Sequence, residues 1–420
     1  MAKLVAGNRL TLLRNGAEYF PALEAAIEAA CNEVHLQSYI FADDVTGRQI
    51  AGALAGAVGR GVRVWVVVDG VGTRKYLGAM LEEMRAVGIQ VINFRPELAP
   101  IDIERQRLRR MHRKVVAVDR RVAFVGGINV IDDMNTPNHT PPRIDFAVQI
   151  EGPLVADIAE SARQLWNVLA WRSVLEGSHA PVRSAALSPG SSSSSRSSSP
   201  SSPSSSSRSS RSSRSSTDAA SLPPTSGAQR AALVVRDNFR HRSDIEDEYL
   251  AAIEGAREEV IIANAYFFPG RRFRRALTQA AARGVRVSLL LQGRVEYVLL
   301  HYATRALYGS LLEAGVEIHE YHKSFLHAKA AVIDSRWATV GSSNIDPFSL
   351  LLAREANLVV EDRRFALDLR SGLLDHMQEG ATAVAKLSWR RLPIRERVRI
   401  WIGYGVARFL IGMYGYGGRH

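Results

Sequence analysis

Apolar and polar residues follow two different periods along this chain, and the two periods predict helices alternating with strands. Phe20, Leu23 and Ile27 recur at steps of three and four residues, which is the spacing of one face of a helix. Because helices and strands alternate, we expect a largely parallel α/β sheet. Predominantly apolar runs indicate the buried strands of the first half at 34–41, 62–68 and 89–94.

The second half of the chain repeats this order of elements. The sequence RGVRV at 60–64 returns at 283–287. Asp244 is expected to cap a helix, which is followed by a strand at 260–268 and a further helix at 271–283. Since the same elements recur in the same order, we interpret the chain as an internal duplication of one α/β unit.

The clearest repeat is a pair of motifs, HRKVVAVDRRVAFVGGIN at 112–129 and HAKAAVIDSRWATVGSSN at 327–344. A His and a Lys two residues apart point to the same face of a strand. A turn, a returning strand and a glycine-led second turn follow, and the glycines let the backbone approach a ligand closely. The shared polar positions are His112, Lys114, Asp119 and Asn129, and His327, Lys329, Asp334 and Asn344.

These motifs carry the groups that chemistry on a phosphodiester requires. Such a reaction needs a nucleophile, a proton donor for the leaving oxygen, and positive charge around the phosphate. Two histidines facing each other supply the first two functions, and Lys114 and Lys329 supply charge without a metal. Asn129, Ser342 and Asn344 are candidate neutral donors to the phosphate. A neutral imidazole can form a covalent phosphohistidine, and the group that attacks it next decides between hydrolysis and transfer.

Carboxylates near the motifs divide into two groups. Asp145 and Glu355 follow the two motifs on the next apolar strands, so they are candidates to orient the histidines through the second ring nitrogen. Asp119 and Asp334 stand at an odd step from the histidines, so strand alternation places them off the His/Lys face and we interpret them as turn-fixing residues. The spacing of carboxylates and histidines does not predict a metal site, and we expect no cofactor.

Composition places the chain among globular proteins. Of its residues, 46% are hydrophobic and 23% charged. Its length of 420 residues is enough for two domains. The single cysteine, Cys31, excludes an internal disulfide and a cysteine-based metal cluster. We recognise neither a signal peptide nor a stretch of about twenty apolar residues. We therefore expect a protein that stays on the cytoplasmic side of the membrane.

The net charge of +12 is concentrated in two segments. The Ser-rich segment 188–227 contributes +3 and the stretch 389–420 contributes +6, which leaves an ordinary +3 for the rest. The core therefore gives little support to nucleic-acid binding. The Ser-rich segment has almost no apolar side chains to bury and is predicted to be a disordered linker. We expect domains at 1–187 and 228–375, this linker between them, and a tail at 376–420.

The tail mixes arginines with apolar and aromatic residues, while its late glycines weaken any helix. We expect it to lie in a membrane interface, where aromatic rings reach headgroup depth and arginines meet anionic lipids. The aromatic residues concerned are Trp401, Tyr404, Phe409 and Tyr414. The alternative is a C-terminal helix packed on the core.

The paired motifs resemble those of the phospholipase D superfamily, which carries two HKD motifs. The resemblance covers about residues 8–175 and 228–375. Flanking sequence such as LYGSLLEAGVEIHEYHKSFLHAK is similar to bacterial cardiolipin synthases, in particular the shorter B-type enzymes without N-terminal transmembrane helices. The resemblance implies two duplicated α/β sandwich domains related by a pseudo-twofold axis, with one shared active site at their interface.

The same resemblance implies a metal-independent phosphatidyl transfer. One phosphatidylglycerol gives a phosphatidyl-histidine and glycerol, and a second phosphatidylglycerol attacks the intermediate to give cardiolipin. By the family pattern His112 is the nucleophile and His327 the acid and then the base, although the symmetry of the motifs leaves this assignment open. The family's active motif also includes Lys114, Asp119, Lys329 and Asp334.

The implied partners are phosphatidylglycerol and an anionic phospholipid membrane, with the protein bound peripherally at the cytoplasmic face of the bacterial inner membrane. The active site is expected to be complete in a monomer, and no nucleic acid is expected. Three other functions stay open: a phospholipase D that uses water or another alcohol, an HKD-type nuclease, and a non-catalytic membrane scaffold. Residue identity does not separate a hydrolase from a synthase, because both use the same catalytic groups.

Overall fold

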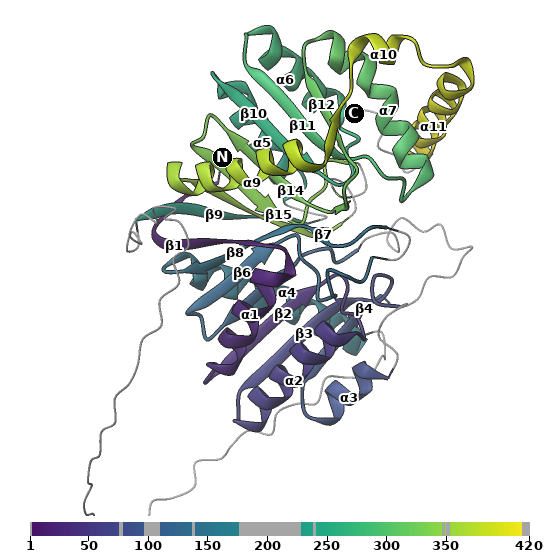
Figure 1. Ribbon diagram of the computed structural model, residues 1–420. Coiled ribbons are helices and arrows are strands. Elements are labelled where there is room, and N and C mark those ends of the chain that lie inside the picture. Colours follow the sequence, from purple (N-terminus) through teal and green to yellow (C-terminus); the bar gives the residue numbers. More distant parts are fainter. Residues whose placement is uncertain are drawn as a thin grey trace, which may run out of the picture.

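The computed structural model describes residues 2–74, 79–95, 110–136, 139–175, 228–237, 241–346, 349 and 353–413. The two halves of the chain form two lobes that meet along one continuous sheet (Figure 1). The first half forms the purple and blue lobe, and the second half forms the green one. The predicted linker at 188–227 lies outside the described residues.

One mixed sheet of the described residues runs in the order β17-β12-β11-β10-β14-β15-β16-β9-β1-β8-β6-β5-β2-β3-β4. Its strands in the first half are β1 (Val5–Arg14), β2 (Glu33–Ser38), β3 (Arg63–Asp69), β4 (Gln90–Phe94), β5 (Val115–Val118), β6 (Val122–Gly126) and β8 (Phe146–Glu151). Those in the second half are β9 (Gln229–Arg236), β10 (Glu259–Asn264), β11 (Arg286–Gln292), β12 (Glu317–Tyr321), β14 (Lys329–Ile333), β15 (Trp337–Gly341), β16 (Glu355–Glu361) and β17 (Ala381–Ala383).

The two halves join at their first strands, β1 and β9, which pair antiparallel. Outward from this pair the strand order is mirrored, with β8 matching β16, β6 matching β15 and β5 matching β14. This order confirms the duplication, because a pseudo-twofold axis between β1 and β9 produces it. Both halves also share one hydrophobic cluster, which contains Leu12, Val148, Val332 and Leu358. Separating the halves would expose this core to water, so they form one folded unit.

The prediction of a largely parallel sheet was wrong. Only β2-β3-β4 and β10-β11-β12 run parallel, whereas the strands nearer the centre pair antiparallel. The cause lies in the tight turns at 119–120 and 334–335, whose residues have φ values between 49° and 55°. A turn with two residues of positive φ reverses the chain directly and builds an antiparallel hairpin. The alternation of helices and strands therefore predicted correctly only the parallel strands toward the two ends of the sheet.

Helices cover both faces of this sheet. They are α1 (Asn15–Glu28), α2 (Val45–Gly59), α3 (Met80–Ala86) and α4 (Leu154–Leu175) in the first half, and α5 (Asp244–Gly255), α6 (Arg271–Ala282), α7 (Val298–Glu313) and α9 (Arg363–Gly380) in the second. α4 and α9 pack on the shared cluster, and the others pack on separate clusters of each lobe. Asp244 does not cap α5 as predicted. The cap position is Ser243, and the Asp244 carboxylate instead lies 2.7 Å from Nδ1 of His241.

The tail forms the helices α10 (Lys386–Arg390) and α11 (Ile394–Met413), although α11 contains Gly403 and Gly405. α11 packs on α7 (Figure 1), and a Cβ at Gly403 would lie only 2.6 Å from Cβ of Tyr302. Gly403 therefore permits close packing of the two helices, which compensates for its low helix propensity. The boundary expected between 375 and 376 falls inside α9.

The contacts of the tail combine both alternatives considered for it. Ile400 and Ala407 are buried, as in a helix packed on the core, while Trp401 and Phe409 are 77% and 66% exposed. Tyr404 was expected at the surface, but it packs edge-on against Phe268 with the ring centroids 6.0 Å apart. Tyr414 lies outside the described residues. Within the part of the chain that the structure describes, no helix has the length and apolar character needed to cross a bilayer.

Candidate active site

A short parallel sheet between the halves positions His327. Its strands are β7 (Arg143–Ile144) and β13 (Phe325–Leu326). His327 follows β13 directly, and its N–H donates to the carbonyl oxygen of Ile144 at 2.8 Å. Asp145 is the residue after Ile144. Backbone pairing between the halves therefore brings His327 and Asp145 together.

An equivalent contact positions His112. Met111 forms a parallel bridge with Arg354, and the N–H of His112 donates to the carbonyl oxygen of Arg354 at 3.0 Å. Glu355 is the residue after Arg354. The second half of the chain therefore holds His112 beside Glu355 in the same way that the first half holds His327 beside Asp145.

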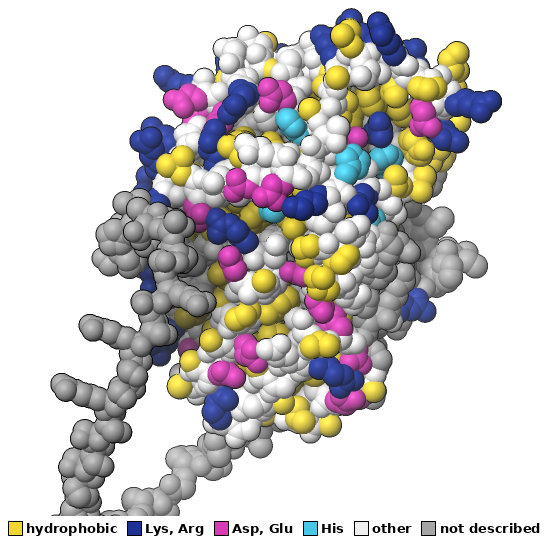
Figure 2. Space-filling view, viewed as in Figure 1, with side chains coloured by type: hydrophobic (Ala, Val, Ile, Leu, Met, Phe, Trp, Pro, Cys, Tyr) yellow, Lys and Arg dark blue, Asp and Glu magenta, His cyan; other side chains and the backbone are white. Residues whose placement is uncertain are grey.

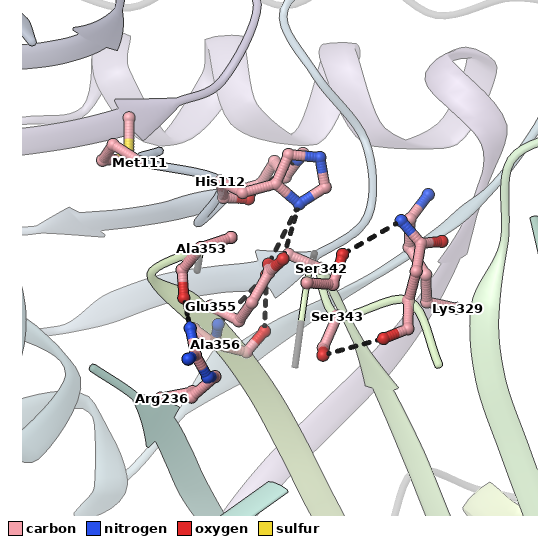
Figure 3. A network of polar contacts seen from close by, with 12 residues as sticks. Met111, His112, Arg236, Lys329, Ser342, Ser343, Ala353, Glu355 and Ala356 are labelled. Atoms are coloured by element: carbon pink, nitrogen blue, oxygen red, sulfur yellow. Dashed lines mark hydrogen bonds and ion pairs between the residues drawn. The ribbon is translucent and has the colours of Figure 1, made fainter. Parts of the chain in front are cut away.

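Each imidazole contacts a carboxylate from the other half. Nδ1 of His112 lies 2.9 and 3.0 Å from the two carboxylate oxygens of Glu355 (Figure 3), and Nδ1 of His327 lies 2.6 Å from Oδ2 of Asp145. A carboxylate at Nδ1 accepts a hydrogen bond from the Nδ1–H group, which keeps the proton on that nitrogen and leaves the Nε2 lone pair available for chemistry. The contacts expected of Asp145 and Glu355 are thus present, and they cross between the halves.

Both lysines of the motifs are buried beside these pairs. Nζ of Lys114 donates to the carbonyl oxygen of His112 at 2.8 Å. Nζ of Lys329 donates to the carbonyl oxygen of His327, and it lies 2.9 Å from Nδ1 of that imidazole and 3.8 Å from Oδ2 of Asp145. Burial lowers the pKa of Lys114 to about 7 and that of Lys329 to about 8, although nearby carboxylates oppose the shift. Both ammonium groups are therefore easier to deprotonate than an exposed lysine.

The same burial shifts the other titratable groups of the site. It raises the pKa of Asp145 to about 6, against the opposing charge of Lys329. It lowers the pKa of His112, and it lowers the pKa of His327 well below its usual value. Neutral imidazoles are the form that can attack phosphorus. A bound phosphate anion would favour the protonated form of either imidazole and so raise its pKa.

Asn129 and Asn344 line the cavity with the two histidines, as expected. Oδ1 of Asn129 accepts from the N–H of Ile40 at 3.0 Å. Asn344 is 3% exposed, and its Oδ1 has no hydrogen-bond partner among the described residues. A buried amide with an unused oxygen beside a cavity is available to a ligand hydroxyl.

Ser342 has a different role from the phosphate donor that was predicted. Its hydroxyl lies beside Glu355 (Figure 3), donates to that carboxylate and accepts from the N–H of Ala356 at 3.0 Å. Ser342 is not among the residues that line the cavity. It therefore positions Glu355. The equivalent residue of the first motif is Gly127, where a Cβ would lie 2.2 Å from Oδ1 of Asp145. Each half thus adapts this position to its own carboxylate.

Asp119 and Asp334 do not lie in the site, so their place among the catalytic residues is not supported. Asp119 accepts hydrogen bonds of 2.7 to 2.8 Å from the backbone N–H groups of residues 31–33. Asp334 accepts from those of residues 257–259 at 2.8 to 3.0 Å. Both occupy the turns at the ends of β5 and β14 that point away from the histidines. The interpretation from strand periodicity, that they fix turns, is confirmed.

The structure adds residues that the motifs did not reveal. The ring of Tyr39 contacts that of His112 with centroids 4.8 Å apart, and Nζ of Lys114 lies 5.4 Å from its centre. Asp69 is fully buried and accepts from the N–H of Met111 at 2.8 Å, so it supports the segment that carries His112. The sequence has no spacing signal for either contact, because both depend on the order in which β5, β2 and β3 lie in the sheet.

The histidines open into one cavity of about 490 Å³. Its walls come from both halves and from the tail, since Ala407 and Leu410 of α11 line it together with Leu299 and Leu300 of α7. The tail, which was expected to lie in a membrane interface or to pack on the core, thus forms an apolar wall of the cavity. Such a wall suits hydrocarbon, while the polar groups of the site gather around the histidines.

Comparison with known proteins agrees with this geometry. The family model described as "Cardiolipin synthase, PLD-like domain" matches residues 23–163 and 249–376. The chain belongs to this family. It is 36% identical to cardiolipin synthase B of Escherichia coli K12 over 391 residues, covering 92% of this chain and 86% of that protein. It is 30% identical to cardiolipin synthase of Geobacillus kaustophilus over 351 residues, covering 83% of this chain and 62% of that protein.

Membership in the PLD-like family makes the chain an enzyme of the phosphatidyltransferase type. A solved structure shares the fold: phosphatidylserine synthase of Haemophilus influenzae superposes with a TM-score of 0.66 over 99% of this chain and 97% of that one, at 12% identity. The duplicated α/β architecture is thus that of the family. Among the described residues, no group of three His, Cys, Asp or Glu side chains is placed to hold a metal ion.

Proposed function

We propose that this enzyme is a cardiolipin synthase, which transfers a phosphatidyl group from one phosphatidylglycerol to another and releases glycerol. The observation that carries the proposal is the crossed pairing of His112 with Glu355 and of His327 with Asp145 around one cavity. Family membership and the relatives named cardiolipin synthase support the same reaction.

The first step uses the two imidazoles in different roles. Nε2 of His112 attacks phosphorus, a P–N bond forms, and the P–O bond to the headgroup glycerol breaks. His327 donates a proton to the departing oxygen, and glycerol leaves. Glu355 and Asp145 hold the two rings and stabilise the charge that develops on them. We assign these roles as the family pattern has them, because the crossed pairs themselves are nearly symmetrical.

The second step reverses the roles of His327. A hydroxyl of the second phosphatidylglycerol gives its proton to His327, its oxygen forms a bond to phosphorus, and the P–N bond breaks to return His112 with its lone pair. Lys114 and Lys329 stabilise the phosphate oxygens through both steps, since their ammonium groups are buried directly beside His112 and His327. Asn129 and Asn344 supply neutral contacts.

We further propose that the enzyme binds an anionic bilayer peripherally through α11 and the start of α7. This docking surface consists of the exposed apolar residues Val298, Trp401, Ile402, Val406 and Phe409. Basic side chains lie among apolar ones over α11 (Figure 2), and the exposed arginines of that helix are Arg395, Arg397 and Arg399. Apolar rings with adjacent arginines suit the interface of an anionic membrane.

The position of the docking surface relative to the cavity supports this proposal. Ala407 and Leu410 of α11 line the cavity, while Trp401 and Phe409 of the same helix face outward. A lipid could therefore pass from the bilayer into the cavity along α11 without exposing its chains to water. Attachment at the cytoplasmic face of the inner membrane, with an active site complete in one chain, stays a prediction.

The reaction is tested with phosphatidylglycerol vesicles in the presence of a chelator, followed by separation and identification of the lipids. Diphosphatidylglycerol and glycerol in equal amounts are expected. Phosphatidic acid as the sole product would instead assign a hydrolase, and a requirement for added metal would contradict the proposed mechanism.

The docking surface is tested with a double variant, Trp401→Ser with Phe409→Ser, by co-sedimentation with anionic vesicles. Loss of two aromatic side chains from an apolar interface should weaken binding by about tenfold or more. Trp171→Ser is a matched control, because Trp171 is 67% exposed but lies on α4 of the other lobe. Point variants are preferable to deletion of the tail, which would open the cavity. Equal binding by both variants would refute the proposed surface.

A further inference from the structure

Equivalent positions in the two halves can be assigned from the backbone. An isolated parallel bridge joins Phe41 to Val130 in the first half, and the corresponding bridge joins Phe267 to Ile345 in the second. Phe41 is therefore equivalent to Phe267, and Val130 is equivalent to Ile345. Comparing the residues next to them shows where the two sides of the site differ.

The two sides differ in polarity beside both pairs of equivalent residues. Phe41 is preceded by Ile40, whereas its equivalent Phe267 is preceded by Tyr266. Val130 is followed by Ile131, whereas its equivalent Ile345 is followed by Asp346. Tyr266 and Asp346 both line the cavity. The His, Lys and Asn positions are duplicated, and Tyr39 brings a phenol to the ring of His112 as well, whereas the carboxylate of Asp346 has no counterpart at its position in the first half. This carboxylate therefore serves a group that only one side of the site meets.

Strand pairing places Tyr266 next to His327. The antiparallel ladder between β10 and β14 runs to Lys329, and a further backbone hydrogen bond of 3.0 Å continues it by one pair. In that register the following pair is Tyr266 and His327. Continuing the ladder between β2 and β5 in the same way puts Ile40 opposite His112. The position opposite His327 therefore carries a phenol and the position opposite His112 a hydrocarbon side chain, although the ring of Tyr39, the residue before Ile40, also contacts His112.

A second carboxylate completes the polar side. The hydroxyl of Tyr266 donates to Glu296, which also lines the cavity from the loop before α7. Burial and the charge of Glu296 raise the pKa of Tyr266 well above its usual value, so its phenol stays a neutral donor. Asp346 is 3% exposed, and Oδ1 accepts from the N–H of Ser349 at 3.2 Å. Two carboxylates and a phenol thus meet beside His327.

We propose that Tyr266, Glu296 and Asp346 form the subsite for the alcohol, and that they select a glycerol headgroup by hydrogen bonds to its free hydroxyls. Carboxylates repel a phosphate anion but accept strongly from hydroxyl groups, so they suit the alcohol side of the reaction. The subsite holds the departing glycerol in the first step and the attacking glycerol headgroup in the second. His327, which moves the proton of that alcohol in both steps, lies opposite Tyr266.

This inference rests on the proposed function, and a competition between alcohols tests it. Enzyme and phosphatidylglycerol vesicles are incubated with isotopically labelled glycerol, 1-propanol and ethanolamine at equal concentrations, and the labelled phosphatidyl products are measured by mass spectrometry. The ratio of products does not depend on the amount of folded enzyme, so a partly misfolded variant still reports selectivity. The wild type is expected to favour glycerol over 1-propanol by about tenfold or more, the effect of one hydrogen bond to a charged group.

Two variants and a control make the test specific. Asp346→Asn and Tyr266→Phe are expected to lower the preference for glycerol by about tenfold. Glu313→Gln is the control, because Glu313 pairs with Arg390 at the far end of α7, outside the cavity. An unchanged preference in both variants, or a wild type without preference, would overturn the inference while leaving the proposed function intact. Preference for ethanolamine would assign the subsite to an ammonium group, and phosphatidic acid alone would overturn both proposals.

Discussion

His112 and Glu355 are separated by 243 residues in the chain, yet Nδ1 of the imidazole lies 2.9 Å from the carboxylate. His327 and Asp145 repeat this relationship in the opposite direction across a separation of 182 residues. Because each imidazole depends on a carboxylate of the other half, neither half contains a complete site. The contacts between each histidine and the carboxylate of the other half therefore join the two duplicated halves and also build the shared site.

Replacing either orienting carboxylate should reduce turnover strongly. Glu355→Gln and Asp145→Asn keep the size of the side chain but remove the negative charge that fixes the imidazole tautomer. We expect each change to lower kcat on the order of 100-fold or more, as loss of an orienting carboxylate does elsewhere. Steady-state kinetics with circular dichroism as a folding control make the measurement. Near-normal kcat in both variants would contradict an orienting role.

The turn aspartates should behave in the opposite way. Asp119→Ala leaves three backbone N–H groups without their acceptor, so we expect a loss of about 1 to 2 kcal/mol of folding free energy. Turnover per folded molecule should stay close to normal, because Asp119 lies outside the cavity. Denaturant unfolding and kinetics on the same preparation separate these effects. A stable but inactive variant would show that Asp119 takes part in catalysis.

Activity should have a bounded pH range. Below about pH 6 Asp145 becomes protonated and no longer stabilises a charged His327, because its folded pKa is raised to about 6. Above about pH 7 to 8 the ammonium groups of Lys114 and Lys329 lose their protons, since burial lowers their pKa values to about 7 and about 8. We expect kcat/KM to fall on both sides of this window. A profile that stays flat from pH 5 to 10 would mean that these groups do not act.

Removing a buried ammonium should stabilise the fold while abolishing activity. The folded pKa of Lys114 lies at about 7, below its ordinary value of 10.5, so folding releases a proton between these pH values. Stability from this group therefore rises with pH through that window and is lowest at and below about pH 7. Lys114→Met should raise the free energy of unfolding at pH 6 by about 1 to 4 kcal/mol. A lower melting temperature than wild type at pH 6 would show that the ammonium contributes net stability.

Much of the site was predictable because its residues stand at fixed spacings within two repeated motifs. The histidines, lysines and asparagines were found in this way, and strand periodicity also separated Asp119 from the cavity side. The crossed pairing was not predictable, because it depends on how β7 lies beside β13 and Met111 beside Arg354. The sequence does not show which segments of the two halves meet. Ser342 shows the same limit, since its hydroxyl contacts Glu355 and not the cavity.

The fold was predicted in its repeats and in the hairpin of each motif, but not in the directions of the other central strands. Alternating helices and strands indicated the parallel parts, and the motifs indicated the turns at 119–120 and 334–335, but the antiparallel pairing of β8 with β6 and of β16 with β15 had no sequence signal. The tail was misjudged for a related reason. Gly403 is unfavourable in an isolated helix, but it fits against Tyr302 once α7 is present.

The central claim is that one phosphatidyl group passes through His112 while His327 moves the proton, and trapping the intermediate tests it most directly. The His327→Asn variant is mixed with phosphatidylglycerol labelled at the phosphate, quenched in alkali and analysed by peptide mass spectrometry. The account predicts label on His112, with none in a His112→Asn, His327→Asn double variant. Label on any other residue of the single variant, or persistence of label in the double variant, would contradict it.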